Sequence, residues 1–361
     1  MSFAVFTDSC SNLPGSLLQH FGIRVLPCSY TVDGKQIIYG GDIEAFDAHT
    51  YYELLRQGKR VTTSLLHTQV FLDHFRPALE QGLDVVYVGL SAGISGTYQA
   101  ACIAAAELRD EFPERTVCPV DSMGAGFGTG LLACRAAELR DEGRSAAEAT
   151  AVLEQEVQNL CEFFTVSDLM FLHRTGRVQA AAALVGTVLN LKPILRGDEE
   201  GHIVTCEKVR GRARAIANLA ARYETRAVHP ELQRVAITHG DCPEDAQALA
   251  ERIEAGVVGY REAVEGADRL PARAVHGRAC RPRHAGPVLL RQRPSIRQHC
   301  IPAASALILA LPQACYERPQ RRRIAQIARV KQPALLRRER AEQEIRLRVV
   351  CDLLAERFSG L

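Results

Sequence analysis

The residues best suited to chemistry in this 361-residue chain lie at a strand-to-helix junction over residues 85–98. An apolar run leads into a short turn that contains two serines and two glycines, and an Ala-rich helical stretch follows. This order places hydroxyl groups and free backbone N–H groups at a helix N-terminus, where a carboxylate or phosphate is stabilised. The junction therefore predicts an anion-binding turn around Ser91, Ser95 and Gly96.

Three further hydroxyl-rich turns follow apolar runs, at residues 7–12, 62–64 and 121–122. Ligand sites in α/β proteins are built on the loops that follow the strands. Together with the first turn, these segments predict a site assembled on the loops of an α/β sheet.

The same junction also permits a different chemistry, because Gly89-Leu90-Ser91-Ala92-Gly93 matches the G-x-S-x-G nucleophile elbow of serine hydrolases. Such an enzyme needs an acid and a histidine further along the chain, and His239 follows a predicted strand. The His-Gly-Gly run that often supplies an oxyanion hole is missing upstream. Serine hydrolysis through Ser91 is retained as the alternative function.

A second glycine-rich segment, residues 124–130, follows another predicted strand. Its spacing is G-x-G-x-G-x-G, which differs from the G-x-G-x-x-G of dinucleotide-binding proteins. Close packing of a helix on a sheet through small residues explains it better, and no cofactor is expected.

The composition, with 47% hydrophobic and 24% charged residues, is typical of a soluble globular protein. The first residues lack the features of a signal peptide, and the apolar run at residues 301–311 is too short to span a bilayer. The twelve cysteines include no C-x-x-C pair, so we expect reduced core residues, no metal site and a cytoplasmic location.

Strand-like and helix-like segments alternate from residue 3 to about residue 255, which predicts an α/β fold with a mostly parallel N-terminal sheet flanked by helices, followed by a second α/β domain. Residues 24–32 are expected to form one strand. Residues 178–189 are apolar on nearly all sides and predict a buried helix. Residues 197–201 predict the turn of a β-hairpin.

In order and spacing, seven segments resemble the DegV family of bacterial fatty-acid-binding proteins: residues 6–13, 62–64, 91–99, 120–122, 168–178, 191–195 and 207–210. The resemblance extends over roughly residues 3–255. It implies a two-domain protein, with domains at residues 1–155 and 156–287, that is not itself an enzyme.

The resemblance also implies a ligand and a partner. One long-chain fatty acid would lie between the domains, its carboxylate held by Thr63 and Ser95, with Ser64 and Gly96 nearby and His284 in a closing loop. The protein would present this acid to a separate ATP-dependent fatty acid kinase subunit, with Arg177 and Arg210 at the docking surface.

The chain departs from the family near its end. Residues 1–267 hold 24 Lys and Arg against 35 Asp and Glu, whereas residues 268–361 hold 20 against 7, and 19 of those 20 are arginine. We expect residues 288–361 to be an atypical Arg-rich tail that lacks the family's final apolar strand, the product of translation out of frame. A basic extension that binds nucleic acid or a membrane is the alternative, which the absence of interleaved aromatic residues disfavours.

Overall fold

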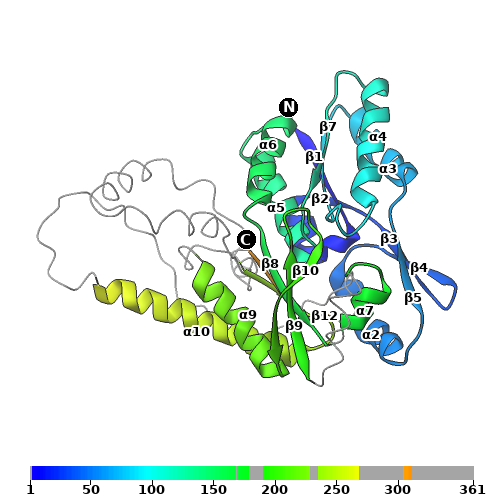
Figure 1. Cartoon of the computed structure of the whole chain (residues 1–361). Helices are drawn as coiled ribbons and strands as arrows, with labels where there is room; N and C mark the ends of the chain where they lie inside the picture. The colour runs from blue at the N-terminus through cyan, green and yellow to red at the C-terminus, as the bar shows by residue number, and fades with distance from the viewer. Residues whose placement is uncertain (1, 168, 179–189, 228–234, 268–303, 311–361) are drawn as a thin grey trace, which may run out of the picture.

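The computed structural model describes residues 2–167, 169–178, 190–227, 235–267 and 304–310. They form three sheets with helices packed around them (Figure 1). The predicted fold class is therefore confirmed. Within the ranges given above, no helix combines the length and apolar character needed to cross a bilayer.

The first sheet is parallel and has the order β2-β1-β6-β7. Its strands are β1 (Phe3–Asp8), β2 (Ile23–Leu26), β6 (Asp84–Gly89) and β7 (Val117–Asp121). All residues of β1 and β6 are buried, as expected for central strands covered on both faces.

Helices cover both faces of this sheet. The helices α3 (Thr68–Glu80) and α4 (Thr97–Glu111) share one apolar core with it, while α1 (Gly15–Phe21), α5 (Phe127–Asp141) and α6 (Ala146–Val157) share another. The glycine-rich segment lets α5 pack closely against the turn after β1, because a Cβ on Gly130 would lie 2.8 Å from the backbone oxygen of Ser11. This supports the interpretation of residues 124–130 as a close-packing segment.

The second sheet is small and antiparallel, with the order β4-β3-β5. It comprises β3 (Cys28–Val32), β4 (Lys35–Tyr39) and β5 (Val61–Ser64), and α2 (Ala48–Arg56) packs beside it. The prediction of one strand over residues 24–32 is wrong, because Pro27 separates β2 from β3 and the two strands join different sheets. Proline cannot donate a ladder hydrogen bond, which favours such a break.

The third sheet is antiparallel, with the order β10-β9-β8-β12-β11. The strands are β8 (Cys161–Val166), β9 (Leu191–Gly197), β10 (Ile203–Arg210), β11 (Val235–Thr238) and β12 (Ala304–Ala310). The predicted hairpin is present, since Ile203 pairs with Gly197. The helices α9 (Arg212–Arg226) and α10 (Pro243–Ala267) contribute to the core on one face.

The position of β12 corrects the expectation for the Arg-rich tail. Residues 304–310 pair with β8 on one side and β11 on the other, so part of this tail forms an inner strand of the third sheet. The expectation that the chain beyond residue 287 supplies no such strand is wrong for these residues. The predicted helix over 178–189, apart from Val178, lies outside the described residues.

One apolar core crosses the expected domain boundary at residues 155–156. Phe3 and Val5 of β1 belong to the same buried cluster as Phe164 and Val166 of β8. The parallel sheet and the third sheet are therefore joined through α5, α6 and shared apolar side chains rather than through a solvated linker.

Candidate functional site

The turn at residues 91–96 follows β6, and an aspartate at the end of each flanking strand holds it: the buried Asp8 on β1 and the half-buried Asp121 on β7. The Asp8 carboxylate accepts hydrogen bonds from the Tyr87 hydroxyl (2.7 Å) and the Leu90 N–H (3.4 Å). The Asp121 carboxylate accepts from the backbone N–H groups of Ala92 and Met123. Burial raises the pKa of both carboxyl groups.

The glycines of this turn permit close contact with the β9–β10 hairpin. A Cβ on Gly93 would lie 2.7 Å from the backbone oxygen of Glu200, and a Cβ on Gly201 would lie 2.1 Å from Ser91 Oγ. Gly201 also has a positive φ of 76°. The two glycines therefore let the turn after β6 contact the hairpin of the third sheet.

Ser91 has no geometry for nucleophilic catalysis. Its side chain is fully buried, and its Oγ donates to the backbone oxygen of Gly201 at 2.9 Å. Nδ1 of His239, the histidine considered for a triad, accepts a hydrogen bond from the backbone N–H of Cys242 at 3.2 Å. The G-x-S-x-G match is explained by tight backbone packing.

The hydroxyls at the start of α4 form a small network. Ser95 Oγ and Thr97 Oγ1 lie 2.9 Å apart, and Thr97 Oγ1 accepts from the backbone N–H of Leu66 at 3.3 Å. These contacts link the N-terminus of α4 to the segment that follows β5. Thr63 and Ser64 lie at the end of β5, where they pair with Tyr30 and Ser29 of β3.

A cavity of about 880 Å³ opens beside this network. Thr63, Ser64, Ser95, Gly96 and Arg177 all line it, so the structure brings five of the predicted site residues to one place. Much of the remaining wall is apolar and aromatic, formed by Tyr30, Tyr39, Phe46, Tyr51, Leu55, Leu65, Leu90, Ile94, Leu172 and Ile203. Its volume lies within the range of about 300–1,000 Å³ that is usual for small-molecule sites.

The two predicted docking arginines lie in different surroundings. Arg177 is half-buried at the cavity, and its guanidinium donates to the backbone oxygen of Thr175. Arg210 is exposed at the end of β10 and is not part of the cavity wall. His284, predicted to lie in a closing loop, is outside the described residues.

Sequence reasoning missed the part of the wall contributed by the second sheet and α2. Tyr30, Phe46 and Tyr51 stack edge to face there, with ring centroids 5.2–5.9 Å apart. Lys59 and Arg60 also line the cavity, and Lys59 pairs with Asp33 at 2.9 Å. The Asp33-Gly34 turn signal and Pro27 were the available indications that a separate hairpin begins here.

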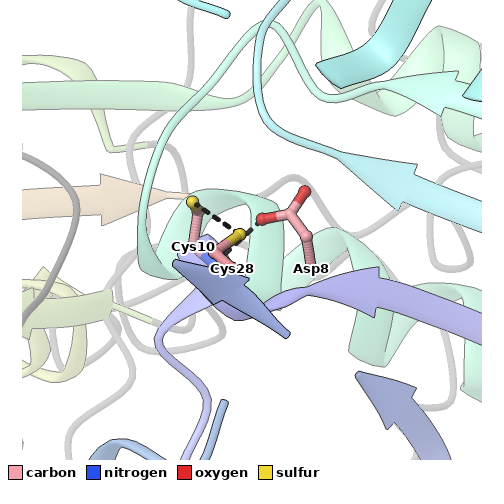
Figure 2. A group of neighbouring side chains, drawn as sticks. All are labelled: Asp8, Cys10 and Cys28. Carbon is pink, nitrogen blue, oxygen red and sulfur yellow. Dashed lines mark hydrogen bonds between the residues drawn. The ribbon is translucent and has the colours of Figure 1, made fainter. Parts of the chain in front are cut away.

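The cysteines differ from the expected core residues. None of the eight in the described ranges forms a disulfide, yet only Cys134 and Cys161 are buried. Cys10 and Cys28 line the cavity, with their sulfur atoms 3.6 Å apart (Figure 2). The hydrogen bond with Cys10, together with burial, raises the pKa of the Cys28 thiol well above its usual value.

Comparisons with known proteins agree with this architecture. A family model, described as that of an uncharacterised protein of the DegV family, matches residues 2–265. The chain belongs to the DegV family. A DegV domain-containing protein of Clostridium perfringens is 34% identical over 251 residues, which cover 70% of this chain and 86% of the relative. A DegV domain-containing protein of Streptomyces coelicolor is 33% identical over 260 residues, or 72% and 89% of the two chains.

Solved DegV structures share the fold. The structure of a Thermus thermophilus DegV protein, described as binding fatty acid, superimposes with a TM-score of 0.65 at 27% identity over 86% of this chain and all of that one. A stearic acid-binding protein of Eubacterium ventriosum gives a TM-score of 0.67 at 19% identity, over 86% and 98% of the two chains. At that identity the second match shows the fold alone.

Proposed function

We propose that this DegV protein binds one long-chain fatty acid in the 880 Å³ cavity. The observation that carries the proposal is the composition of the cavity wall, in which a small set of hydroxyls adjoins a larger apolar and aromatic surface. A fatty acid has the same division, with one anionic group and a long apolar chain. The fatty acid binding described for the Thermus thermophilus relative supports this ligand class.

In this proposal, the hydroxyls of Thr63 and Ser95 donate hydrogen bonds to the carboxylate. Ser95 immediately precedes the N-cap residue of α4, Gly96, so the partial positive charge of the helix N-terminus also favours an anion there. Ser64 and Gly96 complete the polar part of the wall. A carboxylate can be held in this way without a buried lysine.

The acyl chain would lie against the apolar wall, which is contributed by three parts of the fold. Leu90 and Ile94 come from the turn after β6, Leu172 from α7 (Leu169–Arg174), and Tyr30 and Tyr51 from the second sheet and α2. Each methylene group removed from water contributes about 0.8 kcal/mol. The acyl chain would therefore supply most of the binding free energy, while the hydroxyls orient the carboxylate.

We further propose that the protein has no catalytic residue of its own and presents the acid to a separate fatty acid kinase subunit in the cytoplasm. Its two functional units would be residues 1–155 and 156–287, the latter completed by β12. Arg210, exposed at the end of β10, would contact the kinase, and Arg177 would lie where the cavity meets that surface. This part of the proposal rests on the resemblance of the residue 168–178 and 207–210 segments to the family.

Native mass spectrometry of the purified full-length protein tests the proposal. We expect one bound acyl chain per protein, released on denaturation and identified by lipid extraction. Hydrolysis of a p-nitrophenyl ester should be no faster than the uncatalysed rate, and Ser91→Ala should not change it. Protein free of lipid that also fails to take up added fatty acid, or esterase activity that Ser91→Ala abolishes, would overturn it.

A further inference from the structure

The carboxyl ends of β1 and β2 bring Cys28 next to two side chains that lie close together in sequence, Asp8 and Cys10. These strands are parallel neighbours, with Asp8 paired to Leu26. Asp8 ends β1, Cys10 lies in the 3-10 turn that follows, and Cys28 begins β3 just beyond Pro27. One carboxylate oxygen and the two sulfur atoms all lie within 4.8 Å of one another (Figure 2).

The spacing of the two sulfur atoms matches a metal site. Two thiolates bound to a tetrahedral Zn²⁺ at about 2.3 Å lie about 3.8 Å from each other. The Cys10 and Cys28 sulfur atoms are 3.6 Å apart. A disulfide would require them to approach to about 2.05 Å.

The surrounding hydrogen bonds hold the three side chains in place. The backbone N–H of Cys10 donates to Asp8 Oδ1 at 2.9 Å, and the Tyr87 hydroxyl donates to Asp8 Oδ2 at 2.7 Å. The backbone N–H of Cys28 donates to Ser9 Oγ at 2.8 Å. Asp8 Oδ1 retains a second lone pair for a cation, whereas Oδ2 also accepts from the Leu90 N–H. Ligating carboxylates in metal sites are commonly fixed by such outer hydrogen bonds.

The cluster is also accessible. Asp8 is fully buried, but Cys10 and Cys28 are partly exposed and line the cavity. A cation can therefore enter through the cavity, and a water molecule there can supply the fourth ligand. The two thiol protons would leave to solvent as the cation binds.

We propose that Asp8, Cys10 and Cys28 form a three-ligand site for a thiophilic divalent cation such as Zn²⁺, with its fourth coordination position open to the cavity. Two thiolates and a carboxylate favour such a cation over Mg²⁺ or Ca²⁺, which prefer oxygen ligands. The proposed ligands are distinct from the hydroxyls at Ser95 and Thr97, although Cys10 and Cys28 line the same cavity.

Cobalt titration of the full-length protein, reduced and freed of metal with a chelator, tests this site. Co²⁺ bound by thiolates gives charge-transfer and d–d absorption bands, which we expect to saturate at one equivalent and to disappear when Zn²⁺ is added. Cys10→Ser and Cys28→Ser should each weaken Co²⁺ binding at least tenfold and reduce the charge-transfer band. Cys118→Ser, which alters a partly buried thiol on β7, should leave both unchanged.

Circular dichroism of each variant separates loss of the site from loss of the fold, and Cys28→Ser and Cys10→Ser serve as independent tests of the same prediction. Absence of the bands at one equivalent, or bands unchanged in folded Cys10→Ser and Cys28→Ser, would overturn the proposal. So would reduced protein that binds no metal but forms a disulfide between Cys10 and Cys28 on mild peroxide treatment, located by peptide mass mapping, since this identifies a redox pair instead.

Discussion

The hydroxyls of Thr63 and Ser95 line one cavity although 32 positions separate them in the sequence. If both donate to a fatty acid carboxylate, each removes part of the cost of taking that anion out of water. Hydrogen bonds to charged groups are worth about 1.5–3 kcal/mol. We expect Thr63→Ala and Ser95→Ala each to weaken oleate binding roughly 10- to 100-fold, measured by isothermal titration calorimetry of delipidated protein.

The matched control is Thr225→Ala, which removes an exposed hydroxyl on α9 that donates to the backbone oxygen of Ala221. Its affinity for oleate should equal that of the parent protein. Oleate affinity unchanged in both Thr63→Ala and Ser95→Ala would remove these residues from the carboxylate site.

Glu162 on β8 gives the chain a pH-dependent stability. Its carboxylate accepts from the backbone N–H of Ala125, yet burial dominates and raises its pKa to about 8 from 4.5. An acid whose pKa is raised on folding stabilises the folded state fully below about pH 4.5, and this stabilisation is lost as the pH rises to about 8. At about 1.4 kcal/mol per pKa unit, the loss is at most about 5 kcal/mol of unfolding free energy.

We expect Glu162→Gln to remove most of the decrease in unfolding free energy with rising pH, because the amide stays neutral at every pH. Urea unfolding between pH 5 and pH 8.5 measures it. The exposed Glu199→Gln should keep the slope of the parent protein. A Glu162→Gln protein with the parent slope would show that this carboxyl group does not control the pH dependence.

At the scale of elements, two helical glycines should respond in opposite directions to the same change. A Cβ on Gly130 in α5 would meet the rigid backbone oxygen of Ser11 at 2.8 Å. A Cβ on Gly256 in α10 would meet the flexible side chain of Glu224 at 3.2 Å. Overpacking against backbone costs about 1–3 kcal/mol, whereas Gly-to-Ala in a helix otherwise gains up to about 1 kcal/mol.

We therefore expect Gly130→Ala to lower the melting temperature and Gly256→Ala to leave it unchanged or raise it, as measured by differential scanning fluorimetry. Because both changes add one methyl group to a helix, each is the control for the other. A Gly130→Ala protein as stable as the parent would mean that α5 does not pack tightly against the segment around Ser11.

At the scale of the whole molecule, the stability of the third sheet should depend on β12. This strand lies between β8 and β11, so removing it leaves two unpaired strand edges. We expect a chain ending at residue 303 to aggregate or melt well below the parent protein, and one ending at residue 311 to retain the parent melting temperature. Equal melting temperatures for the two truncations would show that β12 contributes no stability.

Replacing each of the two arginines proposed for kinase docking should affect lipid binding differently. Arg210 is exposed and away from the cavity wall, so Arg210→Ala should retain oleate affinity while lowering kinase-dependent phosphorylation of the bound acid. Arg177 lines the cavity, so Arg177→Ala should weaken both. The exposed Arg252→Ala on α10 is the control for lost surface charge. Phosphorylation unchanged in Arg210→Ala would exclude this arginine from the docking surface.

Much of the fold was determined by the sequence alone. The strand-to-helix junction over residues 85–98 and the hairpin around residues 197–201 appear where expected, because apolar periodicity and turn residues act over short distances. The order of seven short segments also indicated the family and the hydroxyl-bearing turns. Whether Thr63 and Ser95 hold a carboxylate stays a prediction.

Only the tertiary structure decided which segments meet. The break at Pro27 sends Cys28 and Tyr30 into a separate sheet, and the aromatic wall follows from that change of partner. The convergence of Asp8, Cys10 and Cys28, and the insertion of β12 beside a strand 140 residues earlier in the chain, have no local signature. Strand pairing between distant segments is set by long-range packing, which residue spacing along the chain does not encode.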